Sequence, residues 1–141
     1  MIDNCNLNVQ MPTQTRNYCV FDENKVNYYL QKREAALPLL KDTFDKSNDE
    51  KEVCEALYIT NRLIGSGVKG AETLYPSISR FNNTKSPNIQ TFLAGVYRKT
   101  KVPDAFGPLV AMLIQNSINP PQNCVFDPNE EIGGAILDYL A

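Results

Sequence analysis

Apolar residues in the middle of the chain recur every three or four positions, the spacing that places side chains on one side of an α-helix. Between residues 88 and 100 these positions are Ile89, Phe92, Leu93, Val96 and Tyr97. After a turn that contains a proline, the same period continues at Val102, Ala105, Phe106, Leu109, Val110 and Leu113. The pattern therefore predicts two consecutive helices, over residues 88–100 and 102–113.

The same period predicts four more helices, over residues 23–45, 50–64, 71–81 and 128–140. Pro38 lies inside the first of them. Because a proline removes one backbone hydrogen bond and clashes with the preceding turn, we expect this helix to be kinked or divided. Residues 115–128 hold three prolines and several amides, so we expect a surface loop there. The sequence thus predicts an all-α domain of six helices.

The start of the chain has a different character. Residues 1–22 have no helical period and are rich in Asn, Gln and Thr, which predicts an extended or poorly ordered arm. A single domain is expected over residues 23–141. The one apolar cluster of the arm, residues 18–21, is expected to dock on the first helix or to form a short strand. Asp22 is expected to cap the helix that follows it.

A glycine-rich turn follows residues 50–64. Its sequence, Gly65-Ser66-Gly67-Val68-Lys69-Gly70, matches the G-x-G-x-x-G pattern of dinucleotide-binding proteins. That chemistry needs a strand before the first glycine, so that the chain can turn tightly beneath a pyrophosphate. Here a helix is expected before it, and Gly65 and Gly67 suit a left-handed helix end and a tight turn. We therefore interpret the motif as a connection between helices.

The residues that usually carry catalysis are scarce. The chain has no histidine, which excludes Ser/His/Asp and Cys/His mechanisms. The four cysteines are Cys5, Cys19, Cys54 and Cys124, and no two of them form a close pair. A structural zinc site is therefore not expected, because it would need all four of these widely spaced thiolates. Their spacing favours reduced thiols over a disulfide framework. We expect no catalytic residue, no cofactor and no metal, and therefore a protein that is not an enzyme.

Composition points to a globular protein. With 141 residues, of which 43% are hydrophobic and 21% charged, the chain can bury one core. Its longest nearly apolar run, residues 105–114, is half the length that a bilayer requires. The first residues do not have the pattern of a signal peptide. We therefore expect a cytoplasmic protein with no membrane association.

Charge is unevenly distributed along the chain. Residues 56–103 carry a net charge of +6, and the remainder carries −8. The basic residues of this segment are Arg62, Lys69, Arg80, Lys85, Arg98, Lys99 and Lys101. Such a segment could contact phosphates, so nucleic-acid binding is an alternative function. A solvated basic face is the other interpretation of the same residues.

Three proline-containing segments align with one another. They are Leu37-Pro38-Leu39-Leu40, Tyr75-Pro76-Ser77-Ile78 and Gly107-Pro108-Leu109-Val110. Each is followed by a polar turn and an apolar helix. A repeat of 30–40 residues with two helices per unit is typical of α-solenoids, because a lone helix pair cannot bury its apolar side.

This pattern resembles the HEAT and armadillo-type repeat family, in which the first helix of a unit commonly carries a bending proline. The resemblance covers about residues 24–141. It implies a right-handed α-solenoid of three helix pairs, with repeats at about 23–66, 67–101 and 102–141. The Asp and Arg that often mark HEAT units are not repeated here, so an ordinary helical bundle remains open.

The resemblance also implies that the second helix of each pair lines a concave surface used for partners. The positions expected to point outward are Glu52, Glu55, Tyr58, Arg62, Gln90, Thr91, Ala94, Arg98, Lys99, Glu131, Gly134 and Asp138. The residues expected to bind a partner are Tyr58, Arg62, Gln90, Thr91, Arg98, Lys99 and Asp138. The predicted function is a non-enzymatic scaffold module that binds a protein or a peptide. A role in small-molecule or chromophore handling, as in bilin lyases, rests on fold analogy alone.

Overall fold

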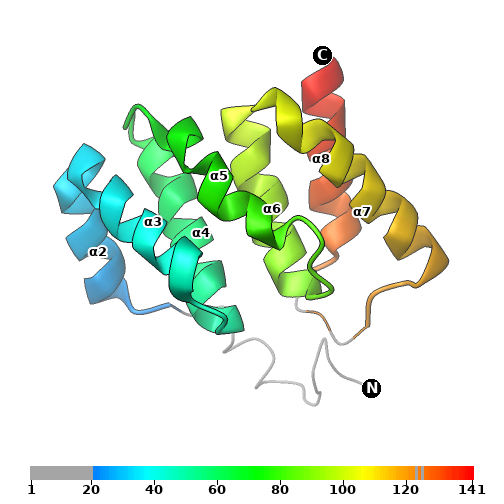
Figure 1. The fold of residues 1–141 in the computed structure, drawn as a ribbon, viewed down its shortest axis with the longest axis horizontal. Coiled ribbons are helices and arrows are strands. Elements are labelled where there is room, and N and C mark those ends of the chain that lie inside the picture. The colour runs from blue at the N-terminus through cyan, green and yellow to red at the C-terminus, as the bar shows by residue number, and fades with distance from the viewer. Residues whose placement is uncertain (1–20, 123, 125) are drawn as a thin grey trace.

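The computed structural model describes residues 21–122, 124 and 126–141, and the regular elements in these ranges are helices (Figure 1). The first segment is divided into α2 (Glu23–Lys32), the 3₁₀ turn η1 (Arg33–Ala36) and α3 (Leu37–Lys46). The second is α4 (Glu50–Gly65). The third joins η2 (Ala71–Leu74), α5 (Tyr75–Ile78) and η3 (Ser79–Phe81). The last three are α6 (Pro87–Thr100), α7 (Phe106–Ile118) after η4 (Pro103–Ala105), and α8 (Pro128–Leu140). Of the predicted arm, only residues 21 and 22 belong to the described part.

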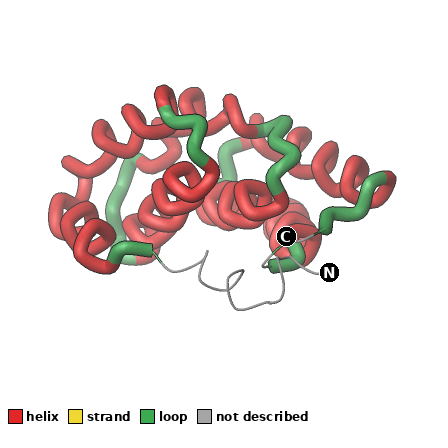
Figure 2. The backbone as a smooth tube through the Cα atoms, turned by 90° about the horizontal axis from the view of Figure 1, so that it is seen from below, coloured by secondary structure: helices red, strands yellow, loops and turns green. Residues whose placement is uncertain are grey.

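The helices form two layers. In one layer α4, α6 and α8 lie side by side, and α6 packs against α4 on one side and against α8 on the other. The other layer holds α3, α5 and α7, of which α3 packs on α4 and α7 packs on α8. Figure 2 shows the two layers as a bowed array with α4, α6 and α8 on its inner side. We call the surface of these three helices that faces away from the other layer the inner face.

Each proline-bearing helix begins directly after a 3₁₀ turn. Pro38 and Pro76 are the second residues of α3 and α5, and Pro108 is the third residue of α7. The first segment is divided at Arg33, whose φ is +53°. Because the ring of Pro38 offers no N–H and clashes with the carbonyl four residues earlier, the chain cannot continue as an α-helix into it. The predicted division is confirmed, and the three prolines occupy corresponding places in one layer.

Four helices begin at a side chain that accepts a backbone N–H from the first turn. These caps are Asp22 for α2, Asp49 for α4, Ser86 for α6 and Asp127 for α8. Such a cap satisfies one of the donors that lack a partner within the helix. The cap expected at Asp22 is confirmed.

The glycine-rich turn connects two helical segments. Gly67 and Gly70 have φ values of +93° and +95°, which residues with a Cβ rarely adopt. The N–H of Gly67 donates to the carbonyl of Ile64 at 3.0 Å, as in a helix end. The left-handed conformation expected at Gly67 is confirmed, whereas the one expected at Gly65 was wrong, because Gly65 is the last residue of α4. A helix, α4, precedes the motif, in agreement with its interpretation as a turn.

Helix α7 is longer than predicted. Residues 115–118, expected in a loop, are helical, and the helix ends before Pro120. Asn116 is buried in this extension, and its Nδ2 donates to Gln90 Oε1 and to Asn129 Oδ1, each at 2.9 Å. A buried amide is tolerated when it has such partners. The local pattern missed them because they lie on α6 and α8.

The core lies between the two layers and is centred on α6. Half of the residues of this helix are buried, namely Ile89, Gln90, Leu93, Ala94, Gly95, Val96 and Tyr97. Burial raises the pKa of the Tyr97 phenol, and its hydroxyl donates to Asn82 Oδ1 at 2.6 Å. This bond ties α6 to the loop that precedes it.

Arg80 connects the third segment to the end of α3. Its Nη1 donates to the carbonyls of Phe44 and Ser47 at 2.9 and 2.8 Å, and its Nη2 donates to Asn48 Oδ1 at 2.7 Å. The last carbonyls of a helix have no partner within the helix. Arg80, which belongs to a different segment, supplies a hydrogen-bond partner for these carbonyls.

We expect Arg80→Ala to lower the free energy of unfolding by about 2 kcal/mol, because three bonds to a charged donor are lost. Arg80→Lys should recover only part of this, since an ammonium lacks the planar fork. Lys85→Ala, at an exposed loop position, is the control and should change stability by less than about 0.5 kcal/mol. Urea denaturation measures all three. Equal effects at both positions would contradict this role for Arg80.

Candidate functional site

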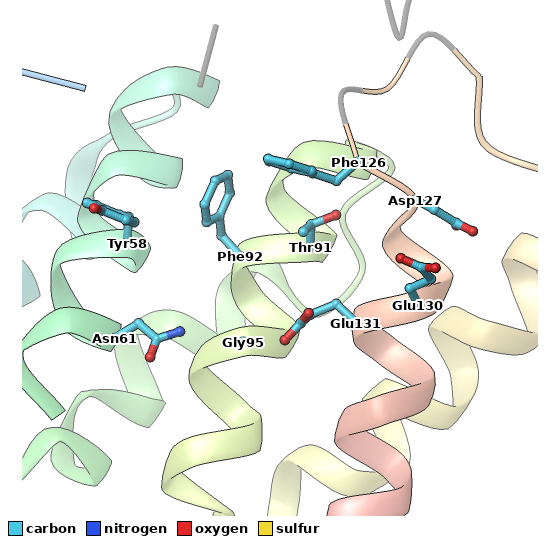
Figure 3. Close-up of a pocket in the computed structure, with 9 residues that line it drawn as sticks. All are labelled: Tyr58, Asn61, Thr91, Phe92, Gly95, Phe126, Asp127, Glu130 and Glu131. Carbon is cyan, nitrogen blue, oxygen red and sulfur yellow. The ribbon is translucent and has the colours of Figure 1, made fainter. Parts of the chain in front are cut away.

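The inner face carries two adjoining hollows. The first has a volume of about 310 Å³ and lies between α4, α6 and the start of α8 (Figure 3). We call it the aromatic hollow, and it is lined by Tyr58, Asn61, Thr91, Phe92, Gly95, Phe126, Asp127, Glu130 and Glu131. The second, the basic hollow of about 490 Å³, is lined by Tyr58, Asn61, Arg62, Gly65, Ser66 and Lys99. Tyr58 and Asn61 line both hollows, which therefore adjoin, and we call the two together the groove.

Four aromatic rings lie in a row beside this groove, and three of them, Tyr58, Phe92 and Phe126, line it. The ring centroid of Phe21 lies 5.1 Å from that of Tyr58 and 5.7 Å from that of Phe92, and Phe92 lies 6.4 Å from Phe126. Figure 3 shows Phe92 standing between Tyr58 and Phe126. Such edge and tilted contacts are the favourable geometries for aromatic pairs. The row gives the groove an apolar wall.

The position of Phe21 corrects one expectation. The apolar cluster at residues 18–21 was expected to dock on the first helix or to form a strand. Phe21 instead docks on Tyr58 of α4 and Phe92 of α6. Residues 18–20 lie outside the described residues.

The aromatic hollow is acidic at the start of α8. Asp127 caps this helix by accepting the N–H of Asn129 at 3.0 Å, and Glu131 accepts a bond from Arg98 at 3.2 Å. The carboxylate of Glu130 has no ion-pair or hydrogen-bond partner among the residues that the structure describes. No Lys or Arg lines this hollow. A negative charge therefore stands beside the aromatic wall.

Arg98 joins α6 to α8. Its Nε lies 2.6 Å from Asp138 Oδ2, and its Nη1 lies 3.2 Å from Glu131 Oε2. The pairing raises the pKa of the Arg98 guanidinium and lowers the pKa of the Asp138 carboxyl. The guanidinium lies against Gly134, where a Cβ would come within 2.9 Å of Nη1. Arg98 and Asp138, both expected to bind a partner, thus bind each other.

Four of the predicted partner-binding residues line the groove, and they are Tyr58, Arg62, Thr91 and Lys99. Nη1 of Arg62 donates to the hydroxyl of Tyr58 at 2.9 Å. The Cζ atom of Arg62 lies 5.7 Å from the centroid of the Tyr58 ring. Lys99 is exposed. The structure therefore brings these four residues to one surface, at the positions that the helical period predicted.

Three positions expected to point outward are buried, so these expectations were wrong. Gln90 is only 4% exposed, and its Nε2 donates to the carbonyl of Thr84 at 3.1 Å. Glu55 is also buried, and its Oε1 lies 2.8 Å from Nζ of Lys25. Ala94 is fully buried. The cause is that α6 lies between α4 and α8, and that α4 is flanked by α6 and by α2, which carries Lys25. Gln90 is therefore not accessible to a partner.

Five of the seven basic residues of segment 56–103 are bonded within the chain or lie far apart. Arg62, Arg80 and Arg98 each donate to groups of this chain. Lys85 and Lys99 lie at opposite ends of α6, and a helix of 14 residues is about 21 Å long. This distribution does not favour nucleic-acid binding through a continuous basic surface.

The chain was compared with protein-family models, with curated proteins and with solved structures, and no significant match was found. Any function must therefore be argued from the groove itself.

The groups in the described part of the chain indicate which kinds of ligand the groove can hold. They contain no group of three or more His, Cys, Asp or Glu side chains placed to hold a metal ion. No helix in the described ranges combines the length and apolarity needed to cross a membrane. The groove offers aromatic rings, amides and charged groups, which hold a ligand by stacking, hydrogen bonding and ion pairing.

The contact between Arg98 and Gly134 gives a direct test of the ion pairs. We expect Gly134→Ala to move the flexible end of Arg98 away while the fold is kept, because the new Cβ would lie too close to the guanidinium. The pKa of the Asp138 carboxyl should then rise toward its ordinary value of about 3.9. Carbon-13 NMR titration of the side-chain carboxyls measures it.

Gly133→Ala is the matched control, since a Cβ there meets nothing within 4 Å. It should leave the titration of Asp138 unchanged. Because the pairing lowers the pKa of Asp138 in the folded state, its contribution to stability is present above the unfolded pKa and is lost as the pH falls through the folded pKa. If the pKa of Asp138 is unchanged in Gly134→Ala, the pairing of Arg98 with Asp138 does not depend on this glycine.

Proposed function

We propose that this protein is a non-enzymatic module that binds a segment of another protein, or a peptide, in the groove of the inner face. The observation that carries the proposal is the groove of two adjoining hollows, in which an aromatic wall lies beside the carboxylate of Glu130. Tyr and Arg are among the residues that most often anchor protein interfaces, and half-buried Tyr58 and exposed Arg62 both line the groove. The groove includes Tyr58, Arg62, Thr91 and Lys99, which supports this use.

The proposal includes an architecture. We infer that the three helix pairs are a short, right-handed α-solenoid that resembles HEAT-type repeats. Two findings support it: Pro38, Pro76 and Pro108 lie in corresponding helices of one layer, and α4, α6 and α8 are neighbours in the other. In arrays of this kind the second helices present one extended surface to partners. The inner face is that surface here.

The lining of the groove indicates the chemistry of the bound segment. An apolar side chain would pack against Phe92 and Phe126 in the aromatic hollow, and a basic side chain would pair with Glu130. At the other end of the groove, Arg62 and Lys99 favour an acidic group on the ligand. A segment with an apolar anchor, a nearby Lys or Arg and a more distant acid therefore complements the groove.

Selection of displayed peptides on the full-length protein tests this function. We expect enriched sequences to combine an aromatic or aliphatic residue with a nearby Lys or Arg. Glu130→Lys should weaken the binding of these peptides at least about tenfold, because it replaces an attraction by a repulsion, and fluorescence anisotropy measures the change.

Glu72→Lys makes the same change of charge at an exposed position of η2, outside the groove, and should leave affinity unchanged. Phe126→Ser should weaken binding as well, since it removes one ring of the wall. If selection enriches no peptide, or if Glu130→Lys and Glu72→Lys bind equally well, the groove is not the binding site.

A further inference from the structure

A third hollow adjoins the basic hollow of the groove at the end of α4. It has a volume of about 290 Å³ and is lined by Asn27, Leu30, Gln31, Arg33, Arg62 and Ser66. Arg62 and Ser66 also line the basic hollow, so the two hollows share a border. We call these two hollows together the basic end.

Three cationic side chains reach the basic end from three neighbouring elements. Arg33 follows α2 directly, Arg62 lies in the last turn of α4 and Lys99 in the last turn of α6, and both α2 and α6 pack against α4. Arg62 shares one hollow with Arg33 and the other with Lys99. Among the described residues, no Asp or Glu lines either hollow. Glu34, the residue after Arg33, accepts the N–H of Lys69 at 3.3 Å.

The charges of the basic end are not neutralised within the described part of the chain. None of Arg33, Arg62 and Lys99 forms an ion pair with a described residue. Arg62 donates from Nη1 to the hydroxyl of Tyr58, and Arg33 donates from Nη2 to the carbonyl of Ser66 at 3.1 Å. A guanidinium has five N–H donors in a rigid fork. Each arginine therefore keeps donors for a ligand.

The two cations on α4 and α6 are not needed to complete their helix ends. The N–H groups of Ser66 and Val68 donate to carbonyls in the last turn of α4, each at 3.0 Å, and the N–H of Lys101 does the same for α6 at 2.8 Å. A basic side chain near the end of a helix often bonds a carbonyl that has no other partner. Because these carbonyls have backbone partners, Arg62 and Lys99 are left to face the hollows.

Arg33 has a backbone conformation that favours glycine. Its φ is +53° and its ψ −126°, a region in which the Cβ of an L-residue is crowded. Its Nη2 would lie 3.7 Å from a Cβ at Gly67, so the guanidinium passes close to the glycine-rich turn. Strained residues of this kind are found at sites where a particular side chain has a role. A glycine would relieve the strain but would remove a charged fork from the basic end.

We propose that the basic end binds a phosphate group on the segment that the groove holds, so that this protein recognises a phosphorylated peptide. The inference rests on the proposed function and names the chemistry of its ligand. A phosphorylated side chain carries about −1.5 to −2 charges at pH 7 and three acceptor oxygens. It therefore matches several cationic donors better than the single charge of a carboxylate does. The fork of arginine binds phosphate through two parallel hydrogen bonds.

The groove sets the spacing between the phosphate and the apolar anchor of the segment. Tyr58 lines both the aromatic hollow and the basic hollow, and Arg62 lies one turn further along α4. On α6, Phe92 of the aromatic hollow and Lys99 of the basic hollow are half of the helix apart, which is about 10 Å. An extended chain advances about 3.3 Å per residue. The phosphorylated residue should therefore lie about three positions from the anchor.

The position of the basic hollow favours a peptide over a membrane as the source of the phosphate. This hollow lies on the inner face of a bowed array (Figure 2), and the aromatic hollow beside it carries the carboxylate of Glu130. An anionic bilayer attracts basic surfaces and repels acidic ones. An extended peptide can follow the groove and place one charged group in each hollow.

Binding of two matched peptide libraries to the full-length protein tests the proposal. Both libraries are randomised around one fixed position, which holds phosphoserine in one library and serine in the other. We expect the phosphoserine library to yield binders with an aromatic or aliphatic residue about three positions from the phosphoserine. A selected peptide should bind at least about tenfold more tightly than its serine version, as measured by fluorescence anisotropy.

Lys99→Glu should reduce this preference for the phosphorylated peptide to less than about threefold, because it replaces an attraction by a repulsion. Lys85→Glu, the matched control, makes the same change of charge at an exposed position near the opposite end of α6 and should keep the preference. Circular dichroism verifies that both variants fold. The preference should also fall as the phosphate gains a proton near its second pKa of about 6. The chain has no histidine that would titrate in the same range.

Each other result overturns the proposal in a different way. Peptides that bind equally well with and without phosphate would contradict the phosphate site and leave the proposed function intact. Equal loss of the preference in Lys99→Glu and Lys85→Glu would place the phosphate elsewhere. If neither library yields a binder, the proposed function fails as well. Flotation with vesicles of phosphatidylcholine and phosphatidylserine is the last arm, and binding to them without binding of phosphopeptides would assign the basic end to a membrane.

Discussion

The fold depends on the packing of α6 between α4 and α8. Small residues on α6 make this close approach possible: Ala94 is fully buried, and a Cβ at Gly95 would lie 3.1 Å from Asn61 Nδ2 of α4. On α8, Gly134 leaves room for the guanidinium of Arg98. Larger side chains at Ala94 and Gly95 would separate the helices and open the core beneath them. The three helices of the inner face are therefore held in one fixed arrangement.

The groove follows from the number of neighbours that each helix of the inner face has. Helix α6 has a neighbour on each side, so its apolar sides become core, and only its inner face, with Thr91 and Lys99, remains for a ligand. Helix α8 has α6 as its one neighbour within this layer, and its Leu137 and Leu140 are exposed.

The helices were predictable from the sequence because their apolar residues recur with a clear helical period. Pro38 predicted the division of the first segment. The contacts between helices were not predictable, since they join residues far apart in the chain. Arg98 and Asp138 are separated by 40 positions, and nothing in their local pattern indicates that they pair. Gln90 was placed on the surface because a single apolar stripe was assumed for α6, whereas this helix is covered on most of its circumference. The extension of α7 was missed for a similar reason, as Asn116 is stabilised by partners on other helices.

Native-state amide hydrogen exchange tests the central place of α6 most directly. If the packing of α6 between α4 and α8 holds the fold together, the amides of Leu93, Val96 and Tyr97 should exchange only through global unfolding. The amides of α2, which packs on the edge of α4, should exchange through local opening at a lower free energy. Amides of α6 that exchange as readily as those of α2 would contradict this account of the fold.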